Sequence, residues 1–189
     1  MNYLEDIKTY LSEEIDVINN LDTKTINQIM NEIVSSQNRG STIFICGNGG
    51  SAATASHFCC DFNKGVSGEM DKNTNFICLS DNIPTLTAIA NDYSYDDVFS
   101  YQLKARAKKD DILFVISGSG NSKNIVNAMR VAKEKNMKII GLCGFDGGFV
   151  KKMSDICLCV EKKNMQIVED IHMILDHCMM YILSSCNVN

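Results

Sequence analysis

Hydrophobic residues in the first forty positions recur with a helical period. Apolar side chains fall every three or four positions from Tyr3 to Asn19, and a second amphipathic stripe runs from Thr23 to Gln37. Asp22 is a candidate N-cap of the second segment, and Gly40 is expected to end it. The pattern predicts two helices that form an N-terminal helical hairpin over residues 1–39.

The pattern changes after residue 40, where short runs become wholly apolar. Such runs are typical of strands buried on both faces of a parallel sheet, and they cover Thr42–Cys46, Phe76–Leu79, Ile112–Ile116, Lys138–Cys143 and Ile156–Val160. Helical patterns lie between and after them, at about 51–63, 84–91, 95–108, 121–135, 147–153 and 165–185. The alternation predicts an α/β sandwich with right-handed crossovers. We expect a single domain over 1–189, with the α/β core in 40–189 and a long C-terminal helix.

Charge and composition exclude several classes of partner. The chain has 189 residues and a net charge of −5, which argues against a surface for nucleic acid or for an anionic membrane. The most apolar long segment, near the C-terminus, contains two histidines and an aspartate and is too short to span a bilayer. An anionic ligand would therefore have to be held by local donors.

The chain has nine cysteines. Their number is odd, no C-x-x-C pair occurs, and several lie inside the apolar runs. We expect reduced, mostly buried thiols. The N-terminal residues are acidic and lack the layout of a signal peptide, so a cytoplasmic location is expected.

Two loops rich in glycine and serine follow the first and third predicted strands. They read GNGGS (Gly47–Ser51) and SGSGNS (Ser117–Ser122), and a predicted helix follows each. Ligands of open α/β sheets bind at the carboxyl ends of strands, and a helix N-terminus offers free N–H donors to a phosphate. The loops therefore indicate a phosphate site. The alternative is that both are ordinary turns in which Ser51 and Ser122 only cap helices.

A dinucleotide-binding loop is a further alternative, because Gly47, Gly49 and Ala52 formally match G-x-G-x-x-G/A. However, Asp81 lies more than thirty residues after Gly47, whereas the fingerprint places its acidic residue about twenty residues on. This interpretation also leaves the second loop without a role, and it is disfavoured.

All three histidines lie on two predicted helices that also contain carboxylates. His57 and Asp61 are four residues apart and share a helix face. Glu169 and His177 are eight residues apart, which on a helix is two full turns plus about 80°, so both can lie along one face of the final helix. Histidine and carboxylate side chains that share a face are candidate general acids and bases. His172 is expected to be a core residue.

Four segments, taken together and in order, resemble the SIS domains of the phosphoheptose isomerase family. They are CGNGGSAATASHF, LTAIANDYSYDDVFSYQL, DDILFVISGSGNSKNIVNAM and KIIGLCGFDGG. The resemblance implies a three-layer sandwich with a five-stranded parallel sheet, and a homotetramer with active sites at subunit interfaces. It also implies interconversion of sedoheptulose 7-phosphate and D-glycero-D-manno-heptose 7-phosphate through an enediol.

The resemblance assigns roles to residues of both loops. It places the phosphate of the substrate and its sugar near Asn48, Gly49, Ser51, Asp92, Ser117, Gly118, Ser119 and Ser122. Gly118 stands where the family usually has threonine, so a hydroxyl is lost while the backbone N–H remains.

The same resemblance implies an acid–base and metal site. Its residues are His57, Asp61, Glu169 and His177, with Asp61 or Glu169 and His177 as the catalytic pair and Zn²⁺ as a cofactor that this set can accept. Asp61 replaces a family glutamate and Glu169 a family glutamine. Asp61 is one methylene shorter than the glutamate, and a shift of about 1 Å in a reacting group can cost on the order of 100-fold in rate, so the two replacements leave the identity of the sugar open.

Two alternative functions stay open. One is an isomerase of a different sugar phosphate, in a surface-glycan or nucleotide-sugar pathway. The other is a non-catalytic SIS module that binds a phosphosugar or a protein partner. The retained titratable set favours an enzyme.

Overall fold

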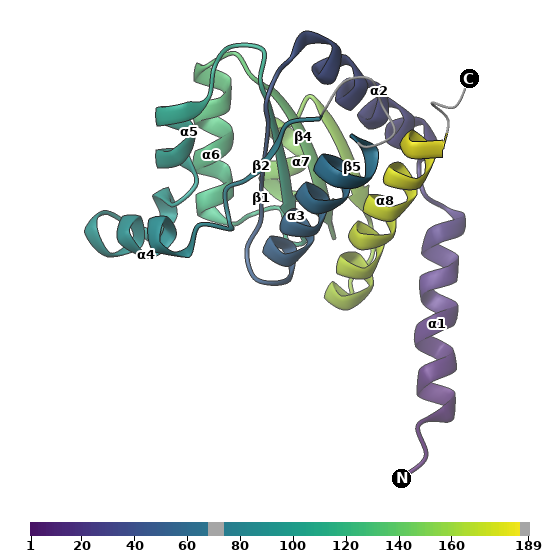
Figure 1. Ribbon diagram of the computed structural model, residues 1–189. Helices are drawn as coiled ribbons and strands as arrows, with labels where there is room; N and C mark the ends of the chain where they lie inside the picture. The colour runs from purple at the N-terminus through teal and green to yellow at the C-terminus, as the bar shows by residue number, and fades with distance from the viewer. Residues whose placement is uncertain (68–73, 186–189) are drawn as a thin grey trace.

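A five-stranded parallel sheet lies between two layers of helices in the computed structural model, which describes residues 1–67 and 74–185 (Figure 1). The strand order is β2-β1-β3-β4-β5. The strands are β1 (Ile43–Cys46), β2 (Phe76–Cys78), β3 (Ile112–Ser117), β4 (Lys138–Gly144) and β5 (Ile156–Val160). Each of the five apolar runs forms a strand, and the predicted fold class is confirmed.

Each face of the sheet is covered by its own set of helices (Figure 1). One layer contains α2 (Thr23–Arg39), α3 (Gly50–Cys60) and α8 (Met165–Ser185), and the other contains α4 (Ile83–Asp92), α5 (Ser100–Arg106), α6 (Lys123–Glu134) and α7 (Gly148–Met153). Side chains of a strand alternate between faces, so Ile43 and Ile45 of β1 pack in the first layer and Phe44 packs in the second. Burial on both faces explains why the strands are wholly apolar.

Local signals in the sequence fix several helix ends. The Asp22 carboxylate accepts hydrogen bonds from the backbone N–H groups of Lys24 and Thr25 at the start of α2. Gly40 ends this helix with φ of 68°, a left-handed conformation that favours glycine. Pro84 lies in the first turn of α4, where its missing N–H costs no hydrogen bond.

Two predicted helices are divided differently in the structure. The segment predicted at 51–63 is α-helical to Cys60 and continues as a π-helical turn, Asp61–Val66. The segment predicted at 95–108 begins with a separate 3₁₀ turn, Tyr95–Asp97, and the Ser94 side chain caps this turn by accepting a hydrogen bond from the Asp96 N–H. Turns of the π type are frequent at functional sites, and this one begins at a predicted site residue.

The first helix, α1 (Leu4–Asn19), has no buried residue and projects from the body of the molecule beside α8 (Figure 1). Near its middle, the Tyr10 hydroxyl donates a hydrogen bond to Asp170 of α8. The predicted apolar stripe is present but exposed by 39–60%, at Leu4, Ile7, Leu11, Ile15 and Ile18. Two consecutive N-terminal helices therefore form as predicted, and α1 leaves its apolar side uncovered.

Two further expectations concern cysteines and membranes. The eight cysteines within the described residues are all unpaired; three are buried, three half-buried and two exposed, so their burial is less complete than expected. Among helices of the same residues, none is long and apolar enough to cross a bilayer.

Candidate active site

The two glycine–serine loops meet at one end of the sheet because β1 and β3 are hydrogen-bonded neighbours. Helix α3 begins after the first loop and α6 after the second, so both helix N-termini open at this edge. A cavity of about 140 Å³ lies there, lined by Asn48, Ser51, Ile116, Ser117, Gly118, Ser119, Ser122, Met165 and Glu169. The structure thus brings six of the eight predicted substrate-binding residues into one cavity.

The serine hydroxyls of this cavity do not cap the helices. The N-cap of α3 is Gly49 rather than Ser51, and no side chain makes a capping hydrogen bond there. Ser122 is the N-cap residue of α6, yet its side chain also makes no capping hydrogen bond. Gly49 has φ of 55°, which favours glycine at this turn. The hydroxyls and helix N-termini suit an anion such as phosphate.

Asn48 is held in one orientation by two residues that the sequence did not single out. Its Oδ1 accepts hydrogen bonds from Tyr95 Oη at 2.9 Å and from Asn124 Nδ2 at 2.8 Å. Its Nδ2 donates to Asn124 Oδ1 at 2.9 Å. An amide nitrogen carries two hydrogens, so one remains to reach a ligand in the cavity.

Gly118, where the resemblance leads us to expect a threonine, lies against a methionine side chain. A Cβ at this position would overlap the Met165 sulfur, since the methionine side chain occupies the space beside the glycine. Met165 is the first residue of α8 and also lines the cavity. The wall beside Gly118 is therefore a thioether here rather than a hydroxyl.

The other two predicted substrate residues lie outside this cavity. Gly49 lines an adjacent cavity of about 170 Å³, which shares Asn48 with the first. Asp92 is exposed at the end of α4, where its Oδ1 accepts a hydrogen bond from Asn91 Nδ2, and it lines neither cavity.

A cluster of histidines and carboxylates lies further along α3, where this helix contacts α8. The Nε2 atoms of His57 and His177 are 3.0 Å apart, and their rings meet edge to face. His57 Nε2 is also 3.5 Å from Asp61 Oδ2 and 4.0 Å from Asp176 Oδ2. Three predicted residues are therefore brought together, and Asp176 joins them.

Asp176 was missed by sequence reasoning. Its side chain is fully buried, and neither carboxylate oxygen has a hydrogen-bond partner. Burial, and secondarily the charge of Asp61, raises the pKa of Asp176 to about 8. The sequence feature that could have pointed to Asp176 is its position as an acidic residue inside the apolar stripe of α8, between Leu175 and Met179.

Glu169 lies outside the cluster, beside the start of α3. Its carboxylate covers the first residue of α3, so that a Cβ added to Gly50 would be 2.5 Å from Glu169 Oε2. The same side chain lines the serine cavity. Among the described residues, the group able to converge on a metal ion consists of His57, Asp61, Asp176 and His177, with ligand atoms within 4.8 Å of one another. Glu169 is not among them.

The cluster fits a zinc ion by its donor chemistry. Two imidazole nitrogens and two carboxylates are ligands that Zn²⁺ accepts in four-coordinate sites. A buried carboxylate without a partner is unfavourable, and a bound cation would give Asp176 the partner it lacks. The third histidine, His172, is buried outside the cluster, with Nε2 3.3 Å from the carbonyl oxygen of Cys143. Burial lowers the pKa of His172 to about 4.

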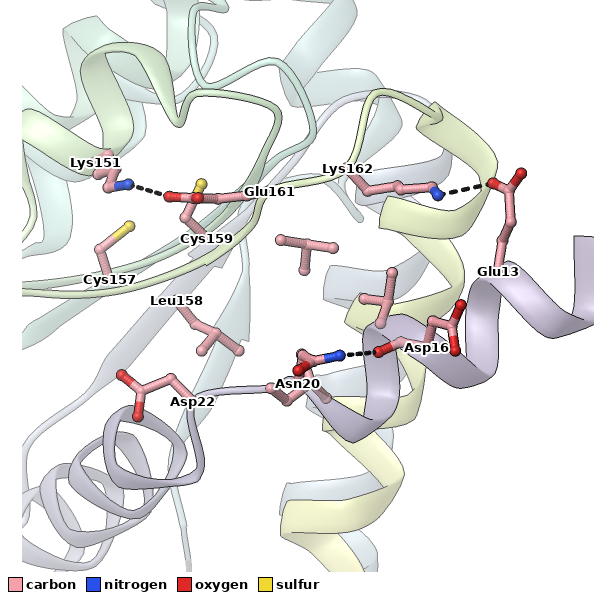
Figure 2. Close-up of a pocket in the computed structure, with 13 residues that line it drawn as sticks. Glu13, Asp16, Asn20, Asp22, Lys151, Cys157, Leu158, Cys159, Glu161 and Lys162 are labelled. Atoms are coloured by element: carbon pink, nitrogen blue, oxygen red, sulfur yellow. Dashed lines mark hydrogen bonds and ion pairs between the residues drawn. The ribbon is translucent and has the colours of Figure 1, made fainter.

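A larger cavity, of about 580 Å³, lies elsewhere, between the end of α1, the start of α2 and β5 (Figure 2). Four of its charged side chains form ion pairs, with Lys151 2.7 Å from Glu161 and Lys162 2.8 Å from Glu13 (Figure 2). It contains none of the predicted site residues. The serine cavity and the histidine cluster therefore define the candidate active site.

A parallel α/β sheet, a serine-lined anion cavity at its carboxyl edge and a nearby acid–base cluster indicate an enzyme that acts on a phosphorylated substrate. Comparison with known proteins agrees. The SIS domain family matches residues 2–144. The chain belongs to this family, and within it to the phosphoheptose isomerases, as the following relatives show.

The phosphoheptose isomerase of Aliarcobacter butzleri is 35% identical over 181 residues, which cover 95% of each chain. That of Helicobacter pylori strain P12 is 42% identical over 150 residues, covering 79% of this chain and 75% of the relative. The solved phosphoheptose isomerase of Neisseria gonorrhoeae superposes with a TM-score of 0.88 at 31% identity, covering 97% of this chain and 100% of the other.

Proposed function

We propose that this chain is an aldose–ketose isomerase that interconverts sedoheptulose 7-phosphate and D-glycero-D-manno-heptose 7-phosphate through an enediol. One observation carries the proposal. In a chain of the phosphoheptose isomerase family, the serine cavity and the histidine cluster lie at two points along the same α3–α8 contact. A phosphate and a reacting carbon pair at opposite ends of one substrate suit this arrangement.

The serine cavity is proposed to bind the phosphate. The hydroxyls of Ser51, Ser117, Ser119 and Ser122 would donate to phosphate oxygens, supported by the backbone at Gly49 and Gly118 and by the N-termini of α3 and α6. The remaining amide hydrogen of Asn48 would reach a sugar oxygen, and Asp92 is proposed near the sugar. Binding energy from the phosphate, which does not react, then holds the open-chain sugar in place.

His177 and Asp61 are proposed to exchange the protons. One takes the proton from the carbon beside the carbonyl, and the other moves a proton between the two substrate oxygens, which gives the enediol and then the isomer. Glu169 is the alternative carboxylate. A Zn²⁺ ion held by His57, Asp61 and His177 would act as a Lewis acid by accepting a substrate oxygen as an additional ligand and polarising it.

We also propose that the protein is a homotetramer with active sites at subunit interfaces. The exposed apolar stripe of α1 supports self-association, because large exposed apolar patches mark interaction sites. A cytoplasmic location is proposed on the unpaired cysteines, since thiols persist in a reducing compartment.

The test is direct turnover. Purified protein is incubated with sedoheptulose 7-phosphate, with and without added Zn²⁺, and the heptose 7-phosphate formed is measured. Sedoheptulose without phosphate is the matched control and should react far more slowly. No turnover in either condition would contradict the proposal. Binding of the sugar phosphate without turnover would favour a non-catalytic module, and turnover of a different sugar phosphate would favour the other isomerase.

A further inference from the structure

Asp176 has no role in the family pattern, yet the fold places it in the histidine cluster. The residue lies on α8 directly before His177, and its side chain points into the contact with α3. Its side chain is 0% exposed, and both carboxylate oxygens lack a hydrogen-bond partner. A fully buried carboxylate in this state is expected to have a cationic partner in the working protein.

We propose that Asp176, rather than Glu169, is the fourth ligand of a zinc ion held by His57, Asp61 and His177. A tetrahedral site with ligand distances of about 2.0–2.2 Å has edges of about 3.3–3.6 Å. The pairs around His57 Nε2 are separated by 3.0, 3.5 and 4.0 Å. The four donor atoms lie within 4.8 Å of one another, so small side-chain movements complete the tetrahedron.

The position of Glu169 supports the same assignment. Its carboxylate is against Gly50, which is seven residues before His57 on α3. Seven residues of helix correspond to a rise of about 10 Å, so Glu169 lies near the serine cavity, and its side chain is that cavity's carboxylate wall. The two acids of α8 therefore have separate roles: Asp176 binds the metal, and Glu169 faces the substrate.

The inference concerns the metal site of the proposed isomerase, but its test needs no substrate. Metal-free wild-type protein and three variants, Asp176→Asn, Glu169→Gln and Asp170→Asn, are titrated with Zn²⁺ in competition with a chromophoric chelator. Asp170→Asn is the matched control, because this exposed acid is on the same helix outside the cluster. The visible spectrum of the Co²⁺-loaded proteins reports the coordination geometry independently.

Wild type should bind one Zn²⁺, and Asp176→Asn should weaken binding by about 100-fold or more, since even outer-shell changes cost 10–100-fold. The tetrahedral Co²⁺ spectrum should also be lost in Asp176→Asn, while Glu169→Gln and Asp170→Asn should keep the wild-type affinity and spectrum. Circular dichroism checks the fold, and Asp176→Leu replaces Asp176→Asn if the latter fails to fold.

Three results would overturn the inference: no zinc binding by wild type, wild-type affinity in Asp176→Asn, or loss of affinity in Glu169→Gln alone. Turnover of sedoheptulose 7-phosphate is measured on the same samples. Turnover with unchanged zinc affinity in Asp176→Asn overturns this inference and leaves the proposed function standing. Zinc binding through Asp176 without turnover supports this inference and contradicts the proposed function.

Discussion

The ring nitrogens of His57 and His177 lie 3.0 Å apart, although the two residues are 120 positions apart in the sequence. At this distance one Nε2 atom donates a proton to the other, or both direct their lone pairs at a shared cation. The packing of α3 on α8 therefore forms a site for a proton or a cation that neither helix could form alone.

Replacing His177 should remove proton transfer while leaving the fold intact, because the residue is exposed. His177→Ala is expected to lower kcat by about 10²–10⁴-fold, the usual contribution of a general acid or base. Initial rates of heptose 7-phosphate formation measure it. Cys178→Ala, the exposed neighbour on α8, is the control and should retain activity. Undiminished turnover by His177→Ala would remove this residue from the reaction.

Ser122 offers a way to separate phosphate binding from helix capping. If its hydroxyl binds phosphate, Ser122→Ala should raise KM for the sugar phosphate by about tenfold or more, since hydrogen bonds to charged groups contribute about 1.5–3 kcal/mol. The melting temperature should hardly change, because the side chain makes no capping hydrogen bond.

Asp22→Ala is the control variant, in which stability and not substrate binding should change. Asp22 caps α2 and does not line the serine cavity, and loss of an N-cap costs about 1 kcal/mol of stability. This variant should melt earlier with KM unchanged. A Ser122→Ala protein that behaves like Asp22→Ala would mean that the serine is only a cap.

The contribution of His172 to stability should fall in mild acid. Burial holds the pKa of this residue at about 4 in the folded protein, against about 6.5 in the unfolded chain. Between these values the unfolded chain binds the extra proton at this residue, so the contribution of His172 to the free energy of unfolding decreases as the pH falls from about 6.5 to about 4. The raised pKa of Asp176 acts in the opposite direction over the same range.

The variant His172→Gln isolates this contribution. Urea unfolding of the metal-free protein is measured at several pH values, and the wild type should lose stability relative to His172→Gln by up to about 1.4 kcal/mol per pH unit in that window. Parallel pH profiles for the two proteins would show that His172 is not held neutral by the fold.

The apolar side of α1 should carry self-association. Leu11→Glu and Ile15→Glu place a charge on the exposed stripe, and each buried side chain of this kind contributes about 1.5–3 kcal/mol. Light scattering after gel filtration should show a smaller assembly, with subunit affinity reduced by about tenfold or more per substitution. Ser12→Glu, also exposed on α1, is the control. An unchanged mass in both glutamate variants would place the interface elsewhere.

The sequence predicted those parts of the fold that depend on local chemistry. The five strands are apolar because both faces are buried, and Asp22, Gly40 and Pro84 mark helix ends through their own backbone preferences. The serine cavity was also predictable, since loops after neighbouring parallel strands must meet at one edge.

Which residues form the histidine cluster could not be predicted from local chemistry, because it depends on how two helices far apart in the sequence pack against each other. His57 and Asp61 share a face through local spacing, and their meeting with His177 was expected from the family. Whether Glu169 or Asp176 faces them is set by how α8 packs on α3, which no spacing within α8 reveals. The π-helical turn at Asp61 was likewise hidden from periodicity.

The parallel contact of α3 and α8 has a consequence for substrate selection. Gly50 faces Glu169, and seven residues on in both helices His57 meets Asp176. Because the two helices keep the same register, they hold the serine cavity and the histidine cluster about 10 Å apart along the helix axis. With C–C bonds of about 1.5 Å, a seven-carbon sugar phosphate can reach both sites and a much shorter sugar cannot. The spacing of the two sites along the helices thus selects for the length of the sugar.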